Sequence, residues 1–162
     1  MKSILLVRHG KSSWEYPLPD KERPLSKRGV NDINLVANAF QNKNTVPNAV
    51  FSSPANRALS TCKLFLQACN ISVERIQIKD QLYDFGGDAV LNFIKNLPDT
   101  IDEAIIFGHN HAFTAVANLL GTIAIDNLPT SGLVKIVCNT DNWQTLTTGK
   151  TELIIIPKEL KQ

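Results

Sequence analysis

The sequence predicts an α/β fold, a single three-layer domain in which a mostly parallel central sheet carries helices on both faces. Apolar runs of strand character alternate with amphipathic stretches of helical period, and this alternation is typical of parallel sheets. A further pair of strands near the C-terminus predicts a hairpin-like end. The runs lie at about 3–8, 48–52 and 103–108, and the final pair lies at about 132–138 and 151–156.

The first half of the chain supplies two strand–helix units. A polar, proline-bearing loop, Lys11–Leu25, separates the first strand from its helix, and Ser26 is the expected N-cap of that helix. Pro54 suits the first turn of the second helix, where a missing backbone N–H costs nothing. The expected elements are strand 3–8, helix 27–43, strand 48–52 and helix 54–69.

The second half continues the alternation and ends in the hairpin. Val73–Ile78 alternates apolar and polar residues as a strand does. Gly86 and Gly87 mark a loop, Asp88 is the expected cap of the following helix, and Gly121 ends the helix after that. The expected elements are helix 89–97, strand 103–108, helix 111–120, and strands 132–138 and 151–156 around a turn through Asp141 and Asn142.

The composition indicates one globular domain over residues 1–162 that needs no metal, cofactor or disulfide. With 43% hydrophobic residues, a chain of 162 residues can bury a full core. The formal net charge of +2 comes from scattered basic residues, so we expect no nucleic-acid partner, and no run approaches the ~18 apolar residues of a membrane span. Cys62, Cys69 and Cys138 lack metal-ligand spacing, and we expect reduced thiols in a cytoplasmic protein.

The chemistry-bearing residues stand where predicted strands end. Arg8 and His9 close the first run, Arg57 follows the second, and His109 follows the third. The carboxyl edge of an open parallel sheet is where ligands bind, so these side chains should converge. A neutral imidazole can attack phosphorus, and a guanidinium pairs bidentately with phosphate oxygens. The pattern therefore predicts a phosphate-sized pocket.

The motifs around these residues resemble a known family in the same order along nearly the whole chain. The chain is similar to histidine phosphatases of the phosphoglycerate-mutase-like fold, and specifically to the small SixA-type phosphohistidine phosphatases. The matching segments are Leu5-Leu6-Val7-Arg8-His9-Gly10-Lys11-Ser12, Glu22-Arg23-Pro24-Leu25-Ser26, Phe51-Ser52-Ser53-Pro54, Arg57-Ala58, Phe107-Gly108-His109-Asn110 and Leu128-Pro129-Thr130-Ser131-Gly132.

The resemblance implies a role for each motif residue. His9 would become phosphorylated, Arg8 and Arg57 would hold phosphoryl oxygens, and His109 would face the same group. Arg23 resembles an extra pocket cation, although a loop-anchoring salt bridge is an equally open reading. The expected catalytic set is Arg8, His9, Arg57 and His109, and the expected substrate-binding set is Arg8, Gly10, Lys11, Arg23, Arg57 and His109.

One departure from the wider fold concerns the general acid. Many members supply a Glu after the third strand, but the stretch from Lys79 to Val90 contains no Glu. Asp84 is the best-placed substitute, and the alternative is that it belongs to a loop or helix cap. Because imidazole leaves phosphorus more easily than an alkoxide does, this gap mildly favours a phosphoramidate substrate.

These residues lead to one preferred function and two alternatives. We expect a metal-independent phosphatase with no cofactor that acts on protein phosphohistidine, with histidine-phosphotransfer-type proteins as candidate partners. The alternatives are a phosphatase of small phosphoesters and a non-catalytic phosphate- or phosphopeptide-binding domain. No insertion is long enough to form a closing lid, so the pocket should be open. Trp14 and Tyr16 on the first loop would contact a protein partner or pack the loop down.

Overall fold

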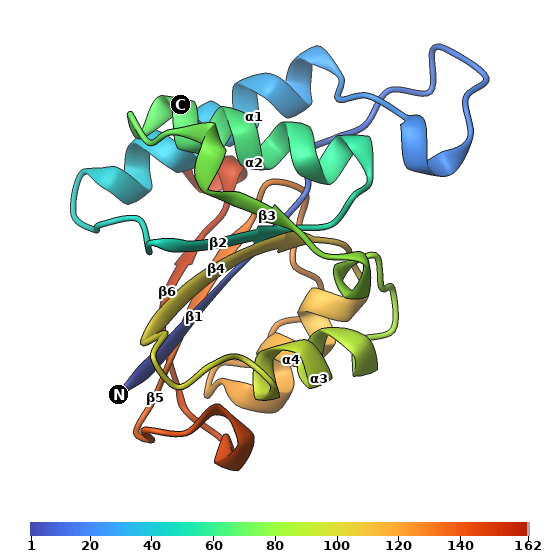
Figure 1. Ribbon diagram of the computed structural model, residues 1–162. Helices are drawn as coiled ribbons and strands as arrows, with labels where there is room; N and C mark the ends of the chain where they lie inside the picture. The colour runs from blue at the N-terminus through green and yellow to red at the C-terminus, as the bar shows by residue number, and fades with distance from the viewer. Residues whose placement is uncertain (162) are drawn as a thin grey trace.

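Six strands form one central sheet in the computed structural model, which describes residues 1–161 (Figure 1). The strands lie in the order β3-β2-β4-β1-β5-β6, and the predicted α/β fold class is confirmed. The strands are β1 (Lys2–Arg8), β2 (Ala49–Ser52), β3 (Ile76–Ile78), β4 (Glu103–Gly108), β5 (Leu133–Cys138) and β6 (Lys150–Ile155). The helices are α1 (Lys27–Gln41), α2 (Asn56–Ala68), α3 (Asp88–Lys95), α4 (Ala112–Leu120) and α5 (Pro157–Leu160).

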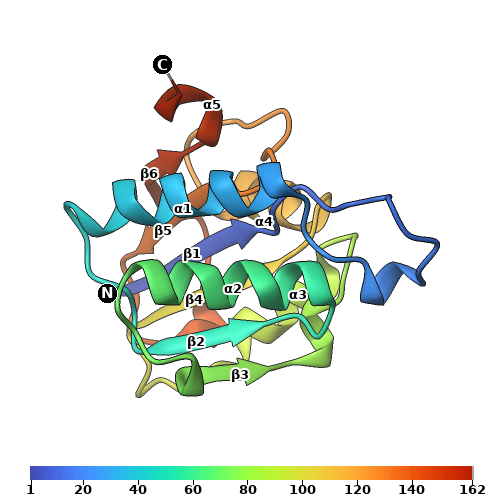
Figure 2. The same ribbon diagram turned by 90° about the horizontal axis from the view of Figure 1, so that it is seen from above.

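The pairing of the strands confirms a mostly parallel sheet with an antiparallel end. Strand β1 pairs in parallel with β4, and β2 pairs in parallel with both β3 and β4. Strand β5 runs antiparallel to both β1 and β6, which gives the predicted hairpin. The carboxyl ends of β1 to β4 therefore meet at one edge of the sheet, as the strand arrows of Figure 2 show.

Helices cover both faces of the sheet, and each face has its own core. Figure 1 shows α1 and α2 on one side of the strands and α3 and α4 on the other. Within β1, Leu5 and Val7 pack toward α1 and α2, whereas Ile4 and Leu6 pack toward α3 and α4. This alternation explains why the run reads as continuously apolar, since a strand buried on both faces has no polar side.

Several element boundaries differ from the prediction. Ser26 is the N-cap of α1 as predicted, and its Oγ accepts a hydrogen bond from the Gly29 N–H over 3.1 Å. Pro54 is not in the first turn of α2, because that helix begins at Asn56. The expected strand 73–78 is half as long, since Val73–Arg75 forms a 3-10 turn. The short helix α5 was not predicted.

The start of α3 was also predicted incorrectly. Asp88 is the first residue of the helix, and Gly87 is the cap residue, with φ of 113° in the left-handed region that favours glycine. The Asp84 side chain caps the start of α3. It accepts hydrogen bonds from the backbone N–H groups of Gly87 and Val90, each over 3.0 Å.

Two further observations concern the helices and the three cysteines. None of the helices within residues 1–161 is long and apolar enough to cross a bilayer. Cys62 and Cys138 are buried, Cys69 is half-buried, and none of the three is bonded to another. Burial raises the pKa of the Cys69 thiol to about 11 and raises the pKa of the other two thiols as well.

Candidate active site

The structure brings the predicted catalytic residues together at the carboxyl edge of the sheet. Arg8 ends β1, His9 follows it, and His109 directly follows β4, the parallel neighbour of β1. The two imidazole rings lie 5.3 Å apart between centroids. Arg57 lies in the first turn of α2, which begins four residues after β2 ends at this edge.

His9 is a neutral imidazole with one protonated and one unprotonated ring nitrogen. Its Nδ1 lies 2.7 Å from the carbonyl oxygen of Gly10, and a carbonyl oxygen can only accept, so Nδ1 carries the proton. The pKa of His9 is lowered to about 4, chiefly by burial; the hydrogen bond to Gly10 acts against this shift, and the positive charges of Arg57, Arg8 and Arg23 add to it. The lone pair on Nε2 is therefore free to attack an electrophile.

Gly10 places this carbonyl by a close backbone approach. Its N–H donates to Thr61 Oγ1 of α2 over 2.9 Å. A Cβ at position 10 would lie 3.0 Å from the carbonyl oxygen of Gly29 and 3.2 Å from Ser131 Oγ. Only glycine fits here without movement of α1, so Gly10 orients His9 through its backbone.

Several buried polar atoms at this edge lack a partner within the described residues. A buried donor without an acceptor costs about 1–3 kcal/mol, so a group of such atoms indicates a place for a ligand. Guanidinium, imidazole and hydroxyl groups supply donors, which suit an anion. The unpartnered atoms from this edge are Arg8 Nε, Arg23 Nε, His109 Nδ1 and Ser131 Oγ.

Arg57 is engaged by a carboxylate from the first loop. Its Nη1 donates to the backbone oxygen of Asp20 over 2.6 Å, and its Nη2 donates to Asp20 Oδ2 over 3.0 Å. The hydroxyl of Tyr83 donates to the same Oδ2 over 2.6 Å. The hydrogen bond from Tyr83 and the pairing with Arg57 keep the pKa of Asp20 below its usual value, so this carboxylate is ionised.

Asp20, which the sequence analysis did not single out, is thus the carboxylate that reaches the site. Asp84 lies elsewhere, and its carboxylate accepts three backbone N–H bonds at the start of α3. These bonds engage the carboxylate of Asp84 at the start of α3, where it serves the loop and the helix end. The cap reading of Asp84 is the one that the geometry supports.

Arg23 anchors the first loop beside the candidate site. Its Nη2 donates to Ser12 Oγ, and its guanidinium lies 3.4 Å from the centroid of the Trp14 ring. The side chain is 7% exposed, and its charge contributes to the lowered pKa of His9. Lys11 differs, because its side chain is exposed and its backbone oxygen accepts bonds from the N–H and hydroxyl of Ser26.

His109 is enclosed by aromatic rings from the segment after β3. Tyr83 and Phe85 lie 5.3 Å and 5.0 Å from its ring between centroids. Burial is the main cause that lowers the pKa of His109 to about 3, and the positive charge of Arg57 acts in the same direction. His109 is therefore neutral, and it contributes a hydrogen bond rather than a charge to the site.

A neutral nucleophile surrounded by guanidinium groups can carry out phosphoryl transfer, which asks mainly for positioning and charge neutralisation. Within residues 1–161, no three His, Cys, Asp or Glu side chains are grouped so that they could hold a metal ion.

Comparison with known proteins identifies the family. The sequence profile of the histidine phosphatase superfamily (branch 1) matches residues 4–93, more than half of the chain. The chain belongs to the histidine phosphatase superfamily. An uncharacterized protein of Mycobacterium tuberculosis is 26% identical over 137 residues, which cover 78% of this chain and 84% of that protein. An uncharacterized chloroplastic protein of Arabidopsis thaliana is 28% identical over 134 residues, covering 76% of this chain and 61% of that protein.

Solved structures of this superfamily share the fold over the whole domain. The protein histidine phosphatase SixA complexed with tungstate has a TM-score of 0.82 at 18% identity, with 98% of this chain and 99% of that chain covered. A SixA-type protein from Agrobacterium tumefaciens has a TM-score of 0.78 at 21% identity, covering 96% and 98%. A mycobacterial glucosyl-3-phosphoglycerate phosphatase has a TM-score of 0.66 at 11% identity, covering 94% and 98%. Family and fold together support a phosphatase.

Proposed function

We propose that this histidine phosphatase hydrolyses phosphohistidine on a protein substrate through a phosphorylated His9 intermediate. The observation that carries the proposal is the fixed tautomer of His9, whose Nδ1–H donates to the Gly10 carbonyl and leaves Nε2 bare. The unpartnered nitrogens of Arg8 and Arg23 offer donors for the phosphoryl oxygens. Together these groups supply a nucleophile and an anion cradle from the protein alone.

The reaction has two displacements at phosphorus. In the first, Nε2 of His9 forms a bond to phosphorus as the bond to the leaving group breaks. In the second, water attacks the phosphorus, the bond to Nε2 breaks, and inorganic phosphate leaves while His9 regains its neutral form. Arg57 must turn from Asp20 toward the phosphoryl group to share in charge neutralisation, so phosphate and the Asp20 carboxylate compete for it.

Two observations favour a phosphohistidine substrate. The acidic side chain at the site, Asp20, is ionised, and an imidazole leaving group depends less on a strong acid than an alkoxide does. The loop beside the site carries exposed apolar side chains, since Trp14 is 73% exposed and Tyr16 58% exposed. A solvent-facing apolar loop suits contact with a folded partner. The similar fold of the protein histidine phosphatase SixA supports this choice.

Phosphoryl-transfer experiments test the proposal. The protein incubated with ³²P-labelled phosphohistidine protein should form an acid-labile phosphoenzyme, and His9→Ala should abolish the label and lower kcat by roughly 10⁴-fold or more. Retained label in His9→Ala would exclude His9 as the nucleophile. Side-by-side kcat/KM values for a phosphohistidine protein and for sugar phosphates decide the substrate class. A clear preference for a sugar phosphate would favour the small-phosphoester alternative, and tight phosphate binding without turnover would favour a binding domain.

A further inference from the structure

Ser53 and His109 form a buried side-chain pair at the candidate active site, next to His9. Ser53 follows β2 and His109 follows β4, the parallel neighbour of β2, so the sheet itself brings the two residues together. Ser53 Oγ lies 2.8 Å from His109 Nε2. Both residues are 0% exposed, so no solvent competes for this hydrogen bond.

The second bond of Ser53 determines the direction of the first. The backbone N–H of Ala55 donates to Ser53 Oγ over 3.2 Å. If His109 Nε2 also carried a hydrogen, two N–H groups would donate to one oxygen. The hydroxyl hydrogen of Ser53 would then be buried without an acceptor, because Oγ makes no other hydrogen bond within residues 1–161. The arrangement in which every group is satisfied has the hydroxyl donating to a bare Nε2.

We propose that Ser53 is a positioning residue that donates to His109 Nε2 and thereby holds the proton of the neutral His109 ring on Nδ1. The Nδ1 atom is buried and has no partner within the described residues. An N–H at this place needs an acceptor, and a phosphoryl oxygen is one. A lone pair at the same place would instead repel a phosphoryl oxygen. This step rests on the proposed function, whereas the tautomer itself does not.

The two histidines of the site then share one tautomer and have opposite uses. The Nδ1–H of His9 is consumed by the Gly10 carbonyl, so His9 presents a lone pair. The Nε2 of His109 is consumed by Ser53, so His109 presents a hydrogen-bond donor. In each imidazole, the hydrogen bond made by one ring nitrogen determines whether the other nitrogen is a donor or an acceptor. The two neutral rings, 5.3 Å apart, thus have different roles: His9 attacks phosphorus, and His109 stabilises the charge on the phosphoryl oxygens.

Long-range ¹H–¹⁵N correlation spectra of protein labelled at histidine test the proposal without any substrate. The wild-type protein should show His109 with a protonated Nδ1 and a bare Nε2. Ser53→Ala should remove this preference and lower kcat by about 10- to 100-fold, the range seen for partners that orient a functional imidazole. Ser53→Thr keeps the hydroxyl and should restore both the tautomer and most of the rate.

Ser52→Ala is the matched control, because the buried Ser52 hydroxyl donates to the backbone oxygen of Ser53 rather than to a histidine. It should keep the wild-type tautomer of His109. A wild-type spectrum with the proton on Nε2, or an unchanged tautomer and kcat in Ser53→Ala, would overturn the proposal. Should Ser53→Ala fail to fold, the wild-type and Ser53→Thr spectra still decide. A protein without phosphatase activity but with the Nδ1 tautomer would refute the proposed function alone.

Discussion

The strand-end residues and the loop residues of the site are held in place by different forces. His9 and Arg8 are tied to neighbouring strands by backbone bonds, from the His9 N–H to the Gly108 oxygen and from the Arg8 N–H to the Gly132 oxygen, both over 3.0 Å. Asp20 of the 11–25 loop is tied to the rest of the domain by bonds with the side chains of Arg57 and Tyr83. His9, the proposed nucleophile, therefore has a rigid support, whereas Asp20 depends on side-chain bonds that phosphate could displace.

The strand ends and the loop should therefore affect different properties of the site. Sites on strands and helices are more precise than sites on loops, and a nucleophile requires that precision. The loop instead determines which anion reaches the guanidinium of Arg57, since Asp20 occupies it in the described structure. Substitutions at strand ends should therefore change the rate of the reaction, whereas substitutions on the loop should change binding and local stability.

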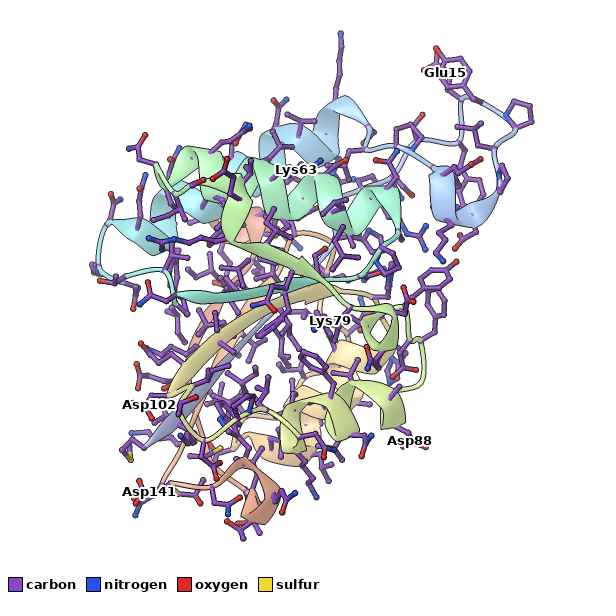
Figure 3. All side chains as sticks on the ribbon, viewed as in Figure 1. Glu15, Lys63, Lys79, Asp88, Asp102 and Asp141 are labelled. Carbon is purple, nitrogen blue, oxygen red and sulfur yellow. The ribbon has the colours of Figure 1, made fainter. Side chains whose placement is uncertain are left out.

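Among the substitutions that compare the two regions, the largest effect should follow removal of Arg57, the cation that joins them. Arg57→Ala should lower kcat/KM by about 10²- to 10³-fold, because it removes a charged donor to the transferring phosphoryl group. Lys63→Ala is the control on the same helix. Lys63 is exposed on helix α2 (Figure 3), so its removal should leave kcat/KM unchanged. Equal losses in both variants would attribute the effect to helix α2 rather than to the guanidinium.

The strand-end histidines should make the domain less stable in acid. The pKa of His9 is about 4 in the folded protein and about 6.5 in an unfolded chain, so the unfolded state binds more protons between these values. Stability is fully present above about pH 6.5 and falls as the pH drops toward 4, by about 3 kcal/mol for His9 alone. Urea unfolding across this range measures the loss.

A substitution of His9 sharpens this measurement. His9→Asn should flatten part of the dependence of unfolding free energy on pH, because one depressed pKa is removed. An unfolding free energy of the wild-type protein that is constant from about pH 6.5 to 4 would contradict the buried neutral histidines.

A moderate effect is expected where the loop meets Arg57. Asp20→Asn removes the negative charge that pairs with Arg57 at 3.0 Å, so inorganic phosphate or tungstate should bind more tightly, by about 3- to 10-fold. Inhibition constants measure the change, and Glu22→Gln, an exposed carboxylate of the same loop, should alter them little. Weaker inhibition of Asp20→Asn would show instead that Asp20 holds Arg57 in its binding position.

The smallest effect should lie within the loop itself. Trp14→Ala removes the ring that stacks on the Arg23 guanidinium and should cost about 0.5–1 kcal/mol of stability. Faster hydrogen exchange confined to the 11–25 loop would report the loss, with kcat on a small phosphoester nearly unchanged. Trp14→Phe retains a stacking ring, so its stability should lie between those of the wild-type protein and Trp14→Ala. A large fall in kcat of Trp14→Ala would show that the loop supports the nucleophile as well.

The same division explains which parts of the structure the sequence predicts. The positions of Arg8, His9 and His109 follow from short apolar runs, because parallel strands align their ends whatever the loops do. The role of Asp20 does not follow, since its partners Arg57 and Tyr83 lie 37 and 63 residues away. The start of α3 was missed for a similar reason, because Asp84 caps the helix across two glycines. Side-chain bonds between loops carry no periodic signal in the sequence.

The buried thiols have a consequence for the conditions under which this protein can work. Phosphatases that attack with a cysteine need an exposed thiolate of low pKa, and such a group is readily oxidised by peroxide. Here the attacking atom of the proposed mechanism is nitrogen, and burial raises the pKa of all three thiols. Oxidants that inactivate a thiolate enzyme would have no comparable thiolate to oxidise among these cysteines. We therefore expect turnover to persist under oxidising conditions.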